Sequence, residues 1–190
     1  GAVPAAPATS AGRSLTAVSP GTPATILLNA HYDSHERYVM ALADELKKEY
    51  ELIHRRGYVL QLACPDLAME RARFFQDDSL ERFQQAVALH VDAINRACAG
   101  IPPDRIRLHL CWGNYDGPHT HDVPLEAVLP LVTRAQVGAL SLPLGNPRHQ
   151  HEHRVIARLG LPGVMLFLPG VIDTTTNYVE QPEVVADRLV

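Results

Sequence analysis

The sequence lacks abundant cysteine, an excess of charge of one sign and any long apolar run. Its 3 cysteines in 190 residues are widely spaced, which argues against a disulfide framework and favours a reducing, cytoplasmic setting. The net charge of −4 provides no basic surface for nucleic acid. No apolar run approaches the roughly 20 residues of a membrane span, and no secretory signal is visible. We therefore expect neither nucleic acid nor a membrane as partner.

The composition is that of an ordinary globular protein, with 46% hydrophobic and 20% charged residues. Residues 1–23 are rich in Ala, Pro, Ser, Gly and Thr, which predicts a linker or a disordered start. Residues 24–190 are long enough for one domain with a substantial core.

Strands and helices alternate along this predicted domain. Period-2 patterns and short apolar runs predict strands at 24–29, 58–63, 105–112, 137–142 and 164–168. Three- and four-residue spacing of apolar side chains predicts helices at 34–56, 80–99, 125–134, 149–159 and 182–190. This order predicts an α/β fold with a parallel sheet. Polar residues cluster just after the strands, where such sheets carry their active sites.

His109 and Cys111 occupy the end of the predicted strand 105–112. Side chains two residues apart on a strand point to the same face, so these two can reach one metal ion. Imidazole and thiolate together suit zinc, although a catalytic zinc needs one more protein ligand. Packing in the core is the alternative role for both residues.

Four sequence stretches resemble a known family. HLCWGNYDGPHTHD, LQLACPDLAM, GNPRHQHEH and PGVIDTTTNYVEQPEVVADRL are similar to the C-terminal catalytic barrel of cobalamin-independent methionine synthases. The similarity is greater to short single-barrel relatives, which include the epoxyalkane:coenzyme M transferase. It implies an incomplete, C-terminal portion of a (β/α)8 TIM barrel of the methionine synthase/uroporphyrinogen decarboxylase type. It also implies a catalytic zinc that binds a thiol substrate and presents it as a thiolate for alkyl transfer.

The resemblance assigns the metal to His109 and Cys111, which match the family's His-x-Cys pair. The family's third ligand is a Cys in an Asp-Cys-Gly motif, which we expect beyond Val190. Missing barrel strands are accordingly expected from the rest of the polypeptide or from a partner chain, and a homo-oligomer is left open.

Three positions depart from the family pattern. Ala63 replaces an Asp that holds the amino group of homocysteine, Pro143 replaces a Glu ligand, and Thr175 replaces a His proton donor. Recognition of homocysteine in the usual manner is therefore not expected.

Other candidate residues surround the expected zinc pair. We predict catalytic roles for Asp66 and Tyr115, with capping of a turn as the alternative for Asp66. The predicted substrate-binding residues are Gln61, Asn114, Arg148, His149 and Glu152. Arg148 is suited to clamp an anionic group, and a surface salt-bridge cluster is the alternative for its segment. His119 and His121 have metal-like spacing but can equally be solvated loop residues.

The predicted function is a zinc-dependent methyl or alkyl transferase that acts on a small-molecule thiol and an alkyl donor. Two alternatives stay open: thiol addition to an epoxide in the coenzyme M manner, and a barrel that has lost catalysis.

Overall fold

The computed structural model describes residues 13–163 and 165–189. Its central element is a parallel sheet whose five strands lie side by side in chain order. The strands are β1 Ser14–Val18, β2 Val59–Ala63, β3 Ile106–His109, β4 Ala139–Pro143 and β5 Leu166–Gly170. Parallel neighbours in sequential order are what a β/α barrel requires of consecutive strands.

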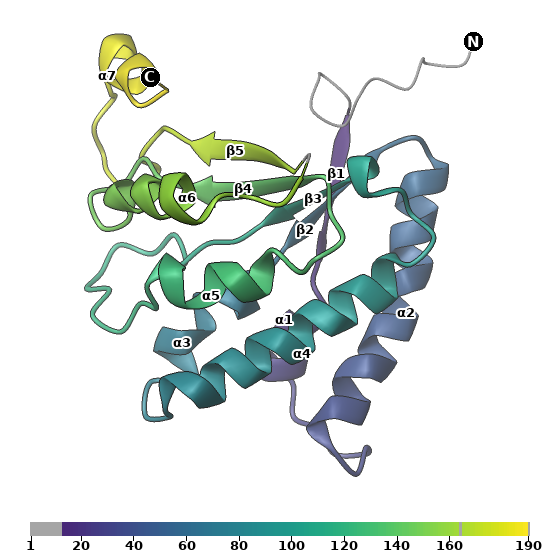
Figure 1. The fold of residues 1–190 in the computed structure, drawn as a ribbon. Helices are drawn as coiled ribbons and strands as arrows, with labels where there is room; N and C mark the ends of the chain where they lie inside the picture. The colour runs from purple at the N-terminus through teal and green to yellow at the C-terminus, as the bar shows by residue number, and fades with distance from the viewer. Residues whose placement is uncertain (1–12, 164, 190) are drawn as a thin grey trace.

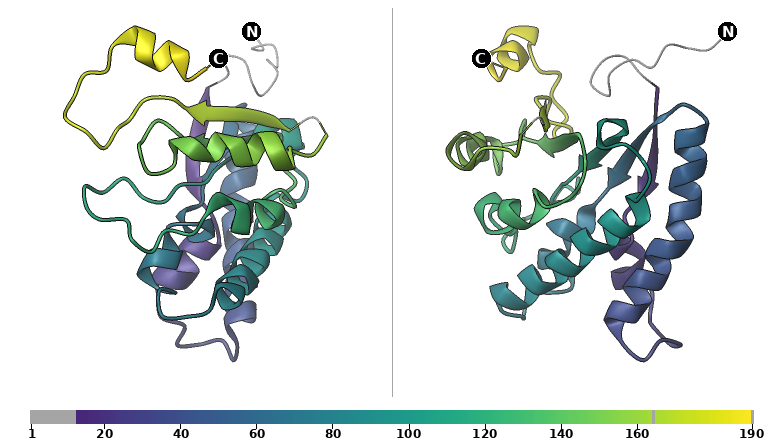
Figure 2. Two further views of the ribbon diagram at one scale, coloured as in Figure 1. Left: turned by 60° about the vertical axis from the view of Figure 1, so that its left-hand side comes forward. Right: turned by 45° about the vertical axis from the view of Figure 1, so that its right-hand side comes forward.

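Helices connect the strands and lie along one side of the curved sheet (Figures 1 and 2). They are α1 Gly21–Ile26, α2 His35–Arg55, α3 Glu70–Arg73, α4 Leu80–Cys98, α5 Leu125–Val132, α6 His153–Leu159 and α7 Pro182–Asp187. Three 3₁₀ turns, Pro65–Leu67, Pro103–Arg105 and Gln150–Glu152, follow or precede strands. Helix α7 stands apart from the other helices in every view.

The two long helices begin where the sequence supplies a cap. The Ser34 hydroxyl accepts a hydrogen bond from the backbone N–H of Arg37, and Ser79 does the same for Arg82. Such caps satisfy N–H groups that have no partner inside the helix. Behind the caps, the apolar stripes of α2 and α4 are buried against each other and the sheet.

The two faces of the sheet differ in chemistry. Leu62, Leu108 and Leu140 are in register across β2, β3 and β4 and are fully buried in the core. The next residues along the same strands, Ala63, His109 and Ser141, are also in register. Because side chains alternate along a strand, this second row lies on the face opposite the core. The register therefore places His109 away from the helices.

The beginning of the described chain differs from the prediction. Ser14–Val18 is a strand within the predicted linker, and the predicted strand 24–29 is wrong because Gly21–Ile26 forms a helix. Strand β1 has only five residues and follows a start rich in Ala, Pro and Gly, and its pairing with β2 supplies the hydrogen bonds that order it. Helix α1 is supported by the Thr25 hydroxyl, which donates to Gly21 O and Thr22 O. Residues 1–12 of the predicted linker lie outside the described residues.

Most other predicted elements are present at nearly the predicted positions. Two predicted elements differ in extent. The predicted helix 149–159 begins as a 3₁₀ turn and is α-helical only from His153. The predicted strand 105–112 is shorter, Ile106–His109, so Cys111 follows the strand rather than lying on it. The α/β class and the parallel sheet are confirmed. The described strands form an open sheet with β1 and β5 at its edges, so the closed barrel stays a prediction.

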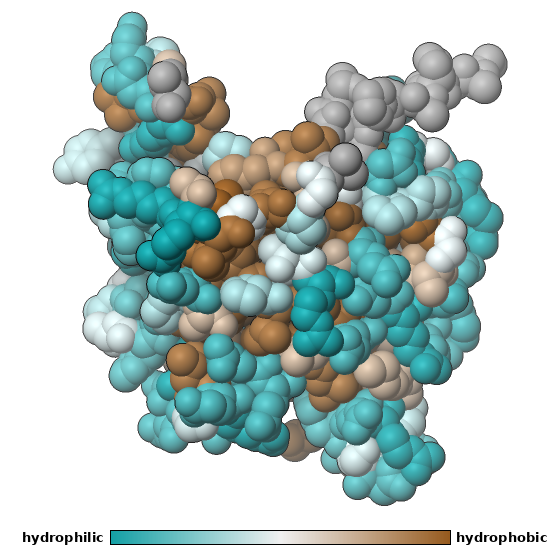
Figure 3. Space-filling view, viewed as in Figure 1, coloured by the Kyte–Doolittle hydropathy of each residue, from teal (hydrophilic) through white to brown (hydrophobic). Residues whose placement is uncertain are grey.

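Apolar side chains are exposed at both sheet edges. Leu15 and Val18 on β1 are 48% and 43% exposed, and Leu166 on β5 is 42% exposed. Figure 3 shows apolar surface over the region of β4 and β5. Within the described ranges, no helix combines the length and apolarity needed to cross a bilayer.

Candidate functional site

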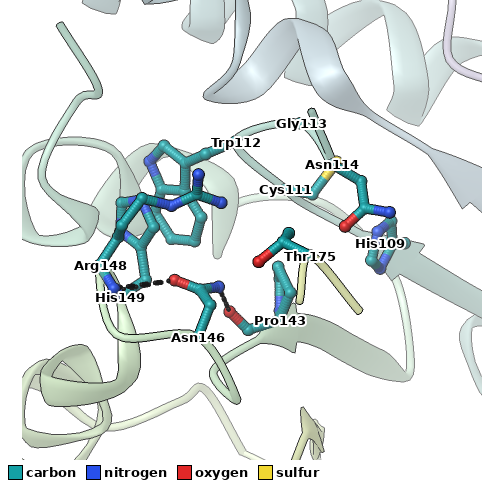
Figure 4. Close-up of a pocket in the computed structure, with 10 residues that line it drawn as sticks. All are labelled: His109, Cys111, Trp112, Gly113, Asn114, Pro143, Asn146, Arg148, His149 and Thr175. Carbon is teal, nitrogen blue, oxygen red and sulfur yellow. Dashed lines mark hydrogen bonds between the residues drawn. The ribbon is translucent and has the colours of Figure 1, made fainter. Parts of the chain in front are cut away.

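A small pocket opens where β3 and β4 end, and we refer to it as the β3–β4 pocket (Figure 4). Its volume of about 110 Å³ suits a compact ligand. The described residues that line it are His109, Cys111, Trp112, Gly113, Asn114, Pro143, Asn146, Arg148, His149 and Thr175. Carboxyl ends of parallel strands are the usual location of active sites in this architecture.

The structure brings His109 and Cys111 to one side of this pocket, as predicted from their spacing. Nδ1 of His109 lies 3.4 Å from the Ser141 hydroxyl on the neighbouring strand. Burial lowers the pKa of His109 and raises the pKa of Cys111. Without a metal ion, the pair is therefore a neutral imidazole and a protonated thiol.

The pair fits zinc by its chemistry but does not complete a site. Among the described residues, no three His, Cys, Asp or Glu side chains are grouped so that they could hold a metal ion. Pro143 and Thr175, which offer no such ligand, line the same pocket. The described chain thus contributes two ligands where a catalytic zinc site takes three from protein.

His149 lies on the other side of the pocket, inside a buried network. Its Nδ1 donates to Glu152 at 2.9 Å and its Nε2 donates to Asp122 at 2.8 Å. The Trp112 ring stacks on the imidazole with centroids 3.8 Å apart. Burial lowers the pKa of His149, but the hydrogen bonds to the two carboxylates more than offset this and raise it overall.

This network fastens the loop after β3 to the turn after β4. Glu152 also accepts the backbone N–H of Leu125 at 2.7 Å, which holds the start of α5. The sequence analysis missed Trp112 and Asp122. The only available signal for Asp122 was its place in the polar run after Cys111, because its partner His149 is 27 residues away.

His119 is part of the same network. Its Nδ1 lies 2.8 Å from the Asp122 carboxylate, and its ring stacks on Tyr115 with centroids 4.0 Å apart. Tyr115 is 44% exposed and does not line the pocket, so its catalytic role stays a prediction. Neither His119 nor His121 belongs to a group of three or more potential metal ligands among the described residues.

Asp66, for which a catalytic role is predicted, does not line the pocket. It is 1% exposed, and its Oδ1 accepts hydrogen bonds from the hydroxyls of Ser19 and Thr22. Its Oδ2 lies 3.1 Å from Nδ1 of His90, which is fully buried on α4. It lies away from the pocket because the turn at Pro65–Leu67 directs Asp66 inward, toward α1 and α4.

Gln61 and Asn114 have different positions relative to the pocket. Gln61 lies on β2 in register with Arg107, two residues below the row of His109, and does not line the pocket. Asn114 does line it, and its Oδ1 accepts a hydrogen bond from the Thr174 hydroxyl at 2.8 Å.

The segment after β4 is organised by Asn146. Its Oδ1 accepts the backbone N–H groups of Arg148 and His149, and its Nδ2 donates to Pro143 O. This turn places both Arg148 and His149 in the pocket lining, as predicted for substrate-binding residues. Glu152 is buried behind His149, so the alternative of a surface salt-bridge cluster is wrong for this pair.

The comparisons with known proteins point to one group of enzymes. No protein-family model matches the chain. The chain is 33% identical over 99 residues to a methionine synthase of Pyrococcus furiosus and 32% identical over 98 residues to a methionine synthase of Thermococcus kodakarensis. These matches cover 51% and 50% of this chain and 25% of each relative. The chain therefore matches about a quarter of the length of these enzymes.

A solved structure extends the similarity to nearly the whole chain. The B12-independent methionine synthase of Shewanella sp. W3-18-1, determined in complex with selenomethionine, superposes with a TM-score of 0.65 at 21% identity. The superposition covers 92% of this chain and 48% of that protein. The fold is thus that of an α/β protein whose parallel sheet corresponds to part of this B12-independent methionine synthase. The predicted resemblance to cobalamin-independent methionine synthases is confirmed.

Proposed function

We propose that this chain is a zinc-dependent methyl or alkyl transferase that acts on a thiol. The observation that supports this most directly is the placement of His109 and Cys111 together in a strand-end pocket. The similarity to methionine synthases supports transfer of a methyl group as the type of reaction.

In this proposal His109 and Cys111 hold the zinc ion. The Ser141 hydroxyl beside Nδ1 of His109 orients the ring and leaves Nε2 for the metal. A third ligand is needed from outside the described residues, in keeping with the Asp-Cys-Gly cysteine expected from the resemblance. When bound, zinc lowers the pKa of a coordinated thiol and keeps it as the nucleophilic thiolate.

The other pocket residues have separate roles in this proposal. Asn114 and Arg148 contact the substrate directly, since both line the pocket. His149 shapes the wall of the pocket, and Glu152 and Asp122 are positioning residues that hold it. Asp66, Tyr115 and Gln61 are not assigned to the reaction, because the structure places none of them in the pocket lining.

The proposed function and its alternative differ in the electrophile that the thiol attacks, a methyl or alkyl donor in the first and an epoxide in the second. Thr175 lines the pocket, and its hydroxyl donates to Asp173, so it replaces an imidazole with a small neutral group. Pro143, which also lines the pocket, stands where the family has a Glu that binds the metal, and proline offers no such ligand. These substitutions favour a thiol other than homocysteine, and addition of that thiol to an epoxide is the second candidate.

The remaining strands of the barrel are also part of the proposal. The exposed apolar side chains of β1 and β5 support pairing of both edges with further strands, from the rest of the polypeptide or from a partner chain.

The first test is the zinc content of the purified protein by elemental analysis, with the Cys111→Ala variant alongside. With the remaining barrel strands present to supply the third ligand, we expect near-stoichiometric zinc that is lost in the variant, because the described chain then contributes only one ligand. Cys98→Ala is the control, since Cys98 is buried in α4 and does not line the pocket. A folded protein that takes up no zinc after supplementation, or equal zinc in both variants, would reject the metal mechanism.

A further inference from the structure

The face of the sheet that lies away from the helices carries an isolated arginine. Five residues in register, one from each strand, form a row on this face: Thr16, Gln61, Arg107, Ala139 and Leu166. Every second residue of a strand faces the same side, so this row shares the face of His109, opposite the core. The five described strands contain no Asp, Glu or Lys, and Arg107 is their only arginine. No strand residue therefore balances its charge.

Arg107 also lacks a counter-ion elsewhere in the described part of the chain. Its Nε is buried without a hydrogen-bond partner, and the ion pairs of residues 13–163 and 165–189 do not include it. Arginines on the helices, in contrast, pair with carboxylates of neighbouring elements, as Arg96 does with Asp44 and Arg158 does with Glu126. A buried charged donor without a partner is costly, so the group that covers this face is expected to supply an anion.

The charge on this face favours further strands over a second copy of the chain as its cover. In a twofold contact both copies present the same surface, so Arg107 would lie against Arg107. Further strands avoid this repulsion. On the same face, Val18 of β1 and Leu166 of β5 are 43% and 42% exposed and offer such strands apolar surface at both edges. The Shewanella protein has more than half of its chain outside the superposition, which covers 48% of it.

We infer, resting on the completing strands of the proposed function, that one of these strands carries an Asp or Glu that pairs with Arg107 inside the barrel. In a ring of eight strands, the five strands described leave three to be added, and the second of these lies opposite β3, which carries Arg107. Side chains fill the interior of such a barrel in layers, so this carboxylate meets the guanidinium away from water. The guanidinium can donate two parallel hydrogen bonds to it.

The test is a set of double-mutant cycles in the full-length protein, which contains the completing strands. Each Asp or Glu of those strands is replaced by Asn or Gln, alone and together with Arg107→Met or, where that variant does not fold, Arg107→Gln. The measurement is the urea midpoint of unfolding. We expect one acid whose replacement lowers the midpoint in the presence of Arg107 and no longer lowers it in Arg107→Met, because the pair is then already broken. Arg107→Lys keeps the charge and should keep the dependence on that acid.

Arg158→Met is the matched control, because Arg158 is exposed on α6 and pairs with Glu126. Its effect should add to that of every acid replacement in the completing strands. Additive effects of Arg107→Met with all of these acids would overturn the inference. A dimer of the full-length protein that Arg107→Met dissociates in sedimentation velocity would also overturn it, as would a rise of the midpoint in sulfate that Arg107→Met abolishes.

Zinc content separates this inference from the proposed function. If one acid is coupled to Arg107 in a folded protein that takes up no zinc, the inference stands and the zinc-dependent function fails. If the protein binds stoichiometric zinc and no acid is coupled to Arg107, the function stands and the inference fails.

Discussion

At the scale of single residues, Glu70 shows how burial controls ionisation in this protein. Its side chain is 1% exposed, and one carboxylate oxygen accepts a hydrogen bond from the Thr25 hydroxyl. Burial, followed by the nearby charge of Asp66, raises the pKa of Glu70 to about 8. The folded protein therefore keeps Glu70 protonated at pH values where the unfolded chain, with an ordinary pKa of 4.5, has ionised it.

We predict that Glu70 makes the protein less stable as pH rises. Its contribution is fully present below the unfolded pKa of 4.5 and is lost as pH rises toward the folded pKa of about 8, by at most about 1.4 kcal/mol per pH unit. Glu70→Gln mimics the protonated side chain, so its urea midpoint relative to wild type should rise between pH 5 and pH 8. Glu49→Gln, exposed on α2, is the control. Parallel pH profiles for wild type and Glu70→Gln would contradict the prediction.

At the scale of elements, α1 packs without space for a side chain at Gly21. A Cβ atom there would lie 2.2 Å from Oδ2 of Asp66 and 2.4 Å from Nδ1 of His90. Those two groups are buried and belong to a turn and a helix that cannot move freely. Glycine at this position therefore lets α1 lie directly over the Asp66–His90 pair.

We predict that Gly21→Ala loosens α1 from the Pro65–Leu67 turn and α4 and destabilises the protein by roughly 1–3 kcal/mol. The measurement is the rate of limited proteolysis, with cleavage sites identified by mass spectrometry, and we expect new cleavage near residues 21–30. Gly117→Ala is the control, because the contacts of a Cβ atom there are with the half-exposed Tyr115 ring at 3.2 Å. If Gly21→Ala and Gly117→Ala resist proteolysis equally, the prediction is wrong, because Asp66 and His90 can then shift to admit a methyl group.

At the scale of the whole molecule, the two sheet edges decide how the chain behaves in isolation. β1 and β5 each have a strand on one side within the described residues, and both expose apolar side chains. Open edges of this kind invite pairing with other chains. The fraction of the relatives' length that the chain covers is consistent with a sheet completed by further strands.

We predict that the isolated 190-residue chain unfolds in a broad transition and associates as its concentration rises. Addition of the strands that complete the barrel should sharpen the transition and yield a defined mass. Calorimetry and sedimentation velocity over a range of concentrations would measure both effects. A sharp, cooperative transition of a monomeric isolated chain would refute the prediction.

The local pattern of the sequence determined five of the seven described α-helices, four of the five strands and the placement of His109 and Cys111 at one strand end. These features depend on residues close together in the chain, where side-chain periodicity and capping operate. The identity of the pocket segments could be predicted because polar residues follow the carboxyl ends of strands in this fold class.

Tertiary structure alone decided the rest of the site. Asp66 turned inward because α1 and α4 supply its partners Thr22 and His90, which lie 44 and 24 residues from it along the chain. Asp122 joined the site because folding brought it to His149, and β1 formed because β2 paired with it. None of these contacts between distant residues leaves a periodic pattern in the sequence. Residue spacing fixed which side chains could act together, and the packing of distant segments fixed which of them reach the pocket.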